Sequence, residues 1–125
     1  MHQLQADLAS GQFVRLYGND RLPSSGDTGA EYREVMMPGY GAQLLNFEDW
    51  NWQTLEAREV GFLFLQPPFL PIYGYFLTER ITGRFLWADA FVDLAGSLTP
   101  ITPSTPNFEL HVTPCLRFAP VLVDA

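Results

Sequence analysis

PIYGYFLTERITGRFLWADAF, residues 71–91, is the stretch of sequence that decides the fold. Aromatic residues dominate two runs within it, and such residues favour a pleated, half-buried surface. Between the runs lie residues 79–84, where Gly83 can adopt the positive φ that a tight connection often needs. The pattern therefore predicts an antiparallel β-hairpin.

The period of two within each run predicts which side chains share a face of the sheet. In the first run, one face takes Ile72, Gly74, Phe76 and Thr78, and the other takes Tyr73, Tyr75, Leu77 and Glu79. In the second run, one face takes Phe85, Trp87, Asp89 and Phe91, and the other takes Leu86, Ala88 and Ala90. Both faces of the first strand are largely apolar, which indicates a strand covered on both sides. The cover is either the second layer of a sandwich or a neighbouring subunit.

The composition indicates one folded domain over residues 1–125. Hydrophobic residues make up 47% of the chain and aromatic residues 14%, which is typical of a globular core. No apolar run approaches the roughly 20 residues that span a bilayer, so we expect no membrane partner. The opening residues 1–10 lack the basic and apolar regions of a signal peptide, so we expect no export by that route. The single cysteine, Cys115, excludes an intrachain disulfide.

The charge of the chain is strongly acidic. Fourteen acidic residues face seven basic ones, all of them arginine, and the formal net charge is −7. Affinity for a phosphate backbone comes largely from clustered cations that displace counterions, and these arginines are spread along the sequence. We therefore expect no nucleic-acid partner.

The remainder of the chain alternates between short strand patterns and turn signals. Leu4 and Leu8 allow one short helix near the N-terminus. Residues 21–29 are expected to form a solvated loop whose only core residue is Leu22. About seven short strands follow from the pattern, and the last covers residues 115–123. The sequence thus predicts an all-β fold, an antiparallel β-sandwich of the jelly-roll type.

Residues 95–107 form a connection that is rich in proline and threonine. Pro100, Pro103 and Pro106 force extended geometry on the residues before them and exclude both a helix and a central strand. We expect an extended arm that lies over the body of the protein or over a neighbouring subunit.

Residue types that perform catalysis are scarce and scattered. His2 and His111 are the two histidines, and no Cys/His spacing predicts a metal site. Cys115 follows His111 by four residues, so the two cannot face each other along one straight strand. Neighbouring carboxylates such as Glu48 and Asp49 are common on any acidic surface. We predict that the protein is not an enzyme and binds no cofactor or metal.

Trp50 and Trp52 flank Asn51, which places both indoles on one face if the segment is extended. The pair either caps the protein's own core or anchors a subunit contact, because aromatic residues are enriched in the cores of interfaces. A third interpretation is a platform for sugar stacking. The candidate interface residues are Trp50, Trp52, Tyr73, Tyr75, Pro100, Pro103 and Pro106.

Five short motifs occur in a recognisable order. They are LYGN with a following proline (residues 16–19 and 23), PGYGAQLL (38–45), YGYFLT (73–78), LWADAF (86–91) and LHVTP (110–114). This order resembles a group of small structural proteins of tailed bacteriophages, and the hairpin motifs are its most specific part. The chain departs from that pattern in a slightly longer hairpin connection, in Ala90 where a charged residue is more usual, and in the Pro/Thr-rich residues 99–106.

The resemblance implies a component of the virion and not an enzyme, and it supplies no functional residues. From it we expect a capsid decoration or cement protein that assembles as a trimer on the major capsid protein or on other virion proteins. Its location would be the virion, assembled in the cytoplasm of the bacterial host. The alternatives are a tail component (an adaptor, a baseplate or a fibre-associated module) and a carbohydrate-binding module.

Overall fold

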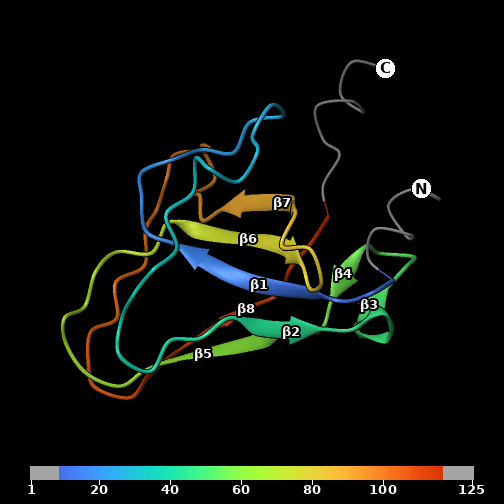
Figure 1. Ribbon diagram of the computed structural model, residues 1–125. Coiled ribbons are helices and arrows are strands. Elements are labelled where there is room, and N and C mark those ends of the chain that lie inside the picture. The colour runs from blue at the N-terminus through green and yellow to red at the C-terminus, as the bar shows by residue number, and fades with distance from the viewer. Residues whose placement is uncertain (1–8, 117–125) are drawn as a thin grey trace.

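The computed structural model describes residues 9–116 and confirms an all-β, antiparallel fold (Figure 1). The strands are β1 (Gln12–Tyr17), β2 (Gln43–Leu45), β3 (Trp50–Asn51), β4 (Glu56–Ala57), β5 (Val60–Phe64), β6 (Gly74–Glu79), β7 (Phe85–Ala90) and β8 (Phe108–Val112), with one short 3-10 helix, η1 (Phe47–Asp49). The predicted helix near Leu4 and Leu8 lies outside the described residues, as does most of the predicted strand 115–123. Over residues 9–116, no helix is long and apolar enough to cross a membrane.

The predicted hairpin forms two strands of a four-stranded antiparallel sheet with the order β2-β1-β6-β7. Strand β6 lies in the interior of this sheet, with β1 on one side and β7 on the other (Figure 1). Gly83 adopts a φ of 76° in the connection, and its N–H donates to the carbonyl oxygen of Glu79 at 2.8 Å. The turn chemistry expected from the sequence is therefore present.

A β-bulge corrects the predicted faces of the second hairpin strand. The pairing of β6 with β7 shifts register between Leu77 and Thr78, so that Leu77 faces Trp87 and Thr78 faces Phe85. Leu86 and Trp87 consequently both pack against the main core, whereas Phe85 packs on the opposite side of the sheet. The expectation that Phe85 shares a face with Trp87 is wrong because the bulge inserts one extra residue between them.

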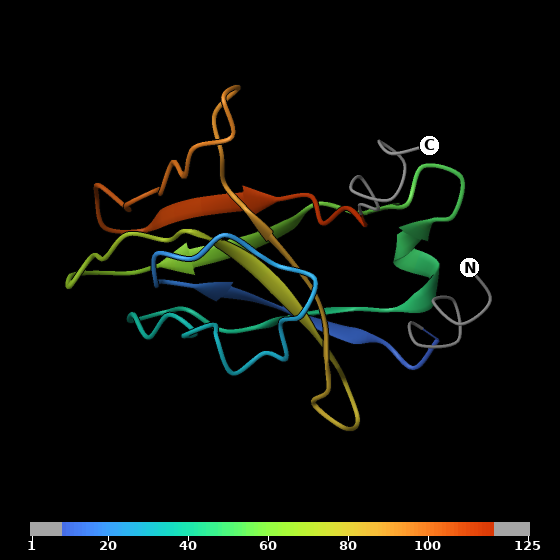
Figure 2. The same ribbon diagram turned by 90° about the horizontal axis from the view of Figure 1, so that it is seen from above.

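The main core joins the four-stranded sheet to the antiparallel ribbon β5-β8. Figure 2 shows the red β8 beside the green β5. Alternation in β5 directs Val60, Phe62 and Phe64 into this core and leaves Gly61 and Leu63 exposed. Core residues of both sheets are Val14, Leu16, Leu45, Tyr75, Leu77, Val60, Phe62, Phe64, Leu110 and Val112. The β-sandwich architecture and its jelly-roll subtype stay predictions.

The other face of β6 is covered by the protein's own loop between β1 and β2, a cover that differs from both of those expected from the sequence. Tyr32 of this loop stacks on Phe76 and Phe85, with ring centroids 5.6 and 5.4 Å apart, and meets the edge of Tyr17 at 4.8 Å. Aromatic pairs of this kind add about 0.5–1.5 kcal/mol beyond the area they bury. No neighbouring subunit is needed to bury this face.

A buried carboxylate holds the loop in place. The side chain of Asp27 is only 3% exposed and accepts hydrogen bonds from the Arg21 guanidinium, the Tyr32 hydroxyl and the backbone N–H of Ser24. Leu22, the expected core residue of the loop, is instead exposed. Around residues 21–27 the loop is therefore held by the charged side chain of Asp27, and Leu22 adds no core contact.

Candidate contact surface

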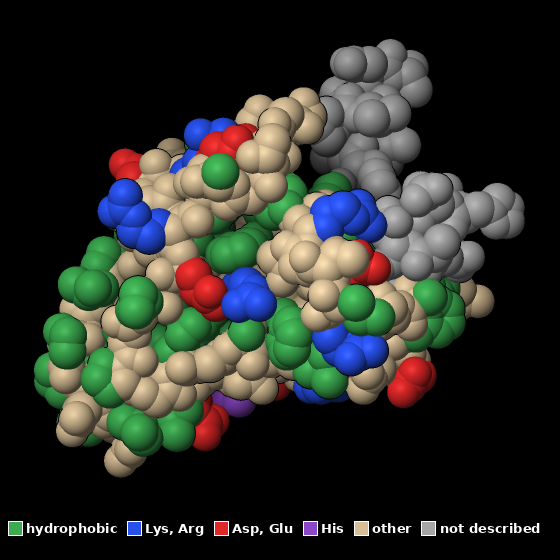
Figure 3. All heavy atoms as spheres, in the orientation of Figure 1, with side chains coloured by type: hydrophobic (Ala, Val, Ile, Leu, Met, Phe, Trp, Pro, Cys, Tyr) green, Lys and Arg blue, Asp and Glu red, His purple; other side chains and the backbone are tan. Residues whose placement is uncertain are grey.

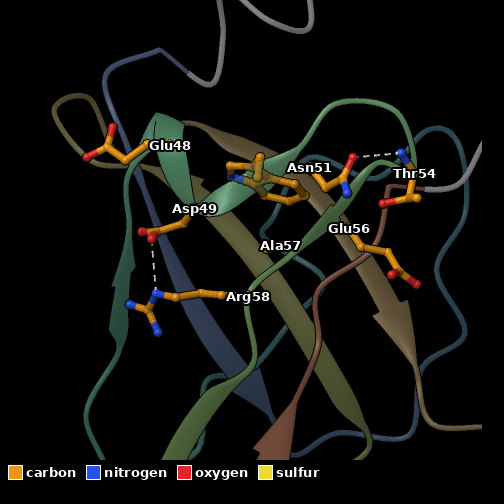
Figure 4. Close-up of a pocket in the computed structure, with 8 residues that line it drawn as sticks. Glu48, Asp49, Asn51, Thr54, Glu56, Ala57 and Arg58 are labelled. Atoms are coloured by element: carbon orange, nitrogen blue, oxygen red, sulfur yellow. Dashed lines mark hydrogen bonds and ion pairs between the residues drawn. The ribbon is translucent and has the colours of Figure 1, made fainter.

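A hollow of about 610 Å³ lies over the β3-β4 hairpin and η1 (Figure 4). Its polar groups hold local backbone in place. Asp49 forms an ion pair with Arg58 at 3.2 Å and accepts a hydrogen bond from the N–H of Asn46 at 2.7 Å. The side-chain oxygen of Asn51 accepts from the N–H of Thr54 at 3.2 Å. Within residues 9–116 no three His, Cys, Asp or Glu side chains are placed to hold a metal ion.

Trp50, beneath this hollow, belongs to the protein's own core. It is 5% exposed, and its Nε1–H donates to the Oε1 of the buried Gln12 at 2.9 Å. Trp52 is half-buried, with its ring centroid 4.9 Å from that of Phe47 and 6.1 Å from that of Trp50. The indoles do lie on one side, as expected, but they pack on each other and offer no open pair of faces for a sugar.

The other predicted interface residues divide by exposure. Tyr75 is buried, and its hydroxyl is bonded to the backbone of Cys115. Tyr73 is half-buried against the Tyr32 cluster. Pro103 is buried, whereas Pro100 and Pro106 are exposed.

Burial therefore corrects the predicted interface. Trp50, Tyr75 and Pro103 are removed from it because their side chains already lie inside the protein. The expectation narrows to Trp52, Tyr73, Pro100 and Pro106.

His111 is an exposed residue of β8, as its alternating pattern indicates. Its Nε2 lies 3.1 Å from Glu109 Oε1 and its Nδ1 lies 3.5 Å from Glu59 Oε1. Cys115 is half-buried and pairs through its backbone with Glu56.

Three segments that meet at one end of the molecule contain no charged residue, and together we call them the uncharged end. It consists of residues 36–41, 65–72 and 99–107, so all seven arginines and all fourteen acids of the chain lie elsewhere. In Figure 1 the three segments run together at the lower left, beyond the ends of β5 and β8. Seven of the ten prolines of the chain lie in them, at positions 38, 67, 68, 71, 100, 103 and 106.

Hydrogen bonds tie the three segments into one surface. The N–H of Leu65 donates to the carbonyl oxygen of Pro38 at 2.9 Å, and the N–H of Asn107 donates to that of Leu65 at 3.1 Å. Ile72 and Ile101 exchange two backbone bonds of 2.8 and 2.9 Å. The Pro/Thr-rich arm therefore lies over the protein's own body, one of the two placements expected from the sequence.

Large apolar side chains project from this uncharged end. Met36 is 87% exposed and Leu70 is 53% exposed, and Leu65 is also exposed. Figure 3 shows hydrophobic side chains gathered at the lower left of the molecule, where the three segments meet. An exposed apolar patch of this kind commonly marks an interaction site.

The sequence contained a signal for this surface that residue-type reasoning missed. Three long stretches lack any charge, residues 35–47, 60–78 and 94–108, and each is bounded on both sides by an acidic residue. Three long stretches without charge in an otherwise acidic chain indicate that part of the surface is uncharged. In the folded chain, parts of all three stretches lie together at the uncharged end.

Comparisons with known protein families, with curated protein sequences and with solved structures found no match.

Proposed function

We propose that this chain is a structural protein of a bacteriophage particle, a capsid decoration or cement protein that stabilises the assembled head. The observation that carries the proposal is the uncharged end, a firmly hydrogen-bonded apolar surface on an otherwise acidic body. The resemblance of the hairpin motifs to small virion proteins supports the same class. The major capsid protein and further copies of the chain are its proposed partners.

The proposed mechanism is stabilisation by mass action. A protein that binds the assembled shell and not its dissociated subunits lowers the free energy of the assembled state by RT ln(1 + [L]/Kd), which is about 2.7 kcal/mol at a hundredfold excess over Kd. The acidic exterior limits non-specific adhesion to packaged or free nucleic acid. No group transfer or turnover is required of any side chain.

The test compares particles assembled with and without this protein. We expect particles that lack it to release DNA at a lower temperature, and purified protein added back to restore the higher temperature. Unchanged release temperatures would contradict the cement role. Mass spectrometry of purified particles then gives the copy number, which is in the hundreds for a shell protein and about a dozen or fewer for a tail component.

A further inference from the structure

We propose that the uncharged end is a homotypic interface, which binds the same end of another copy of this chain. The inference rests on the proposed contact function and names the partner of that surface. Copies would gather around a rotation axis beside the uncharged end, with their acidic bodies pointing outward. Closed rotational symmetry of this kind is the common arrangement of homo-oligomers.

Charge is the first reason for choosing a second copy as the occupant. Each copy carries a formal net charge of −7, so most approaches of two copies bring carboxylates together. Screening at physiological ionic strength weakens such repulsion beyond about 8 Å. The three segments of the uncharged end hold none of the fourteen acids, and the nearby Glu34 is engaged by the Tyr40 hydroxyl and the Arg15 guanidinium. An approach at this end therefore brings few carboxylates into the contact.

The same absence of charge disfavours a strongly charged partner. Specific recognition of a charged surface uses complementary charges at the interface, and this end has none to offer. An uncharged apolar surface is best matched by another uncharged apolar surface. Every copy of this chain carries such a surface, so a matching partner is present wherever the chain is present.

The size of the uncharged end fits a standard interface. Its segments have six, eight and nine residues, of which Met37, Ile72 and Pro103 are buried. The others reach the lower end of the roughly 20–30 residues that one partner contributes to such an interface. A standard interface buries about 800 Å² on each partner, which is close to a tenth of the accessible surface of 7370 Å².

The chemistry of proline lowers the free-energy cost of burying this surface. Proline has no backbone N–H, so the seven prolines of the uncharged end leave fewer donors to desolvate. Part of the remaining backbone is held by the bonds of Leu65 to Pro38 and of Ile72 to Ile101. A surface that is ordered before binding loses less conformational entropy in the complex.

Sedimentation velocity and light scattering of the purified chain test the proposal, from about 1 μM to about 1 mM, the range of weak to moderate affinities. We expect a concentration-dependent oligomer that persists or tightens as salt is raised, because salt screens the residual repulsion between copies. A chain that stays monomeric throughout this range would overturn the inference. An oligomer that dissociates with added salt would also overturn it, since that dependence indicates a charged contact.

Two variants and a matched control locate the contact. Leu70→Glu places a carboxylate in the uncharged end, and we expect at least a tenfold weaker self-association. Met36→Glu should act in the same direction, and it is so exposed that folding is not at issue. The control is Leu22→Glu, because Leu22 is 53% exposed, as is Leu70, but lies in the loop between β1 and β2. Equal effects of Leu22→Glu and Leu70→Glu, or no effect of Leu70→Glu and Met36→Glu, would refute the assignment.

The same samples separate this inference from the proposed function. Binding to particles that lack the protein is measured beside self-association. A monomeric chain that still stabilises particles refutes the homotypic contact and leaves the cement function standing. A chain that self-associates through Leu70 and Met36 but never binds particles supports the contact and removes the function.

Discussion

The hydroxyl of Tyr75 on β6 forms two hydrogen bonds with the backbone of Cys115, forty residues further along the chain. It accepts from the Cys115 N–H at 2.9 Å and donates to the Cys115 carbonyl oxygen at 3.2 Å. Cys115 lies beside the β3-β4 hairpin, where it pairs with Glu56. A single phenol thus joins an interior strand of the large sheet to the segment that follows β8.

Replacing this phenol measures the strength of the link. Tyr75→Phe keeps the ring in the core but leaves the half-buried N–H and carbonyl of Cys115 without their partner. We expect the free energy of unfolding to fall by about 1–3 kcal/mol, measured by urea denaturation. The matched control is Tyr73→Phe, because Tyr73 is half-buried on the same segment and packs through its ring. A loss for Tyr75→Phe no larger than that for Tyr73→Phe would show that the two bonds contribute nothing.

The carboxylate of Asp27 gives the fold a predictable response to acid. The hydrogen bond from the Arg21 guanidinium is the largest of several causes that together lower the pKa of Asp27 from 3.8 to about 2. A carboxyl with a lower pKa in the folded state stabilises the fold above its unfolded pKa. That contribution is lost as the pH falls from about 4 to about 2.

Asp27→Asn isolates this contribution. We expect the wild-type chain to be more stable than the variant at pH 6, and the difference to shrink as the pH falls from about 4 to about 2. Urea denaturation at a series of pH values measures it. Asp20→Asn is the control, because Asp20 is exposed on the same loop. If the free energies of unfolding of Asp27→Asn and the wild type differ by the same amount at pH 6 and at pH 2, the ionised Asp27 carboxylate does not stabilise the fold.

Gly74, at the start of β6, has no room for a side chain. A Cβ built there would lie 2.3 Å from the Asp89 carbonyl oxygen and 2.7 Å from Cε1 of Tyr17. The nearest of these atoms is backbone, so relief requires the sheet itself to move. We expect Gly74→Ala to lower the free energy of unfolding by at least about 2 kcal/mol.

Gly41→Ala is the control for this effect, because a Cβ at Gly41 meets nothing within 4 Å. Both variants are compared by thermal or urea denaturation. A Gly74→Ala variant as stable as Gly41→Ala would show that β6 and β7 separate freely at this point.

The hairpin could be predicted because its signal is local. Residues 71–91 contain both the alternating side chains and the glycine of the connection. Strands β6 and β7 lie where this pattern predicts them. The bulge at Leu77 and Thr78 could not be predicted from the local sequence. The position of Phe85 depends on its stacking against Tyr32, which lies more than fifty residues earlier in the chain. Register is a property of the packed sheet and not of one strand.

The contact surface was harder to predict for the same reason. The presence of a tryptophan did not identify the contact surface. Trp50 lies in the core, where its Nε1–H donates to the buried Gln12. The exposed residues Met36 and Leu70 have ordinary neighbours in the sequence. Their segments meet only in the folded chain, where the N–H of Leu70 donates to the sulfur of Met37 at 3.4 Å. The charge pattern, not residue type, carried the information.

The pairing of Ile72 with Ile101 predicts that the arm is ordered in the free chain. Each amide donates to the other's carbonyl, at 2.8 and 2.9 Å, and Ile72 is fully buried. Amides in such a bridge exchange hydrogen only when it opens. By hydrogen exchange in dilute solution, we expect both to exchange at least about tenfold more slowly than Ser104 and Thr105 of the same arm, since tenfold corresponds to about 1.4 kcal/mol. If Ile101 exchanges as fast as Thr105 until the concentration is raised, the arm is ordered by association, and the uncharged end is not formed in advance.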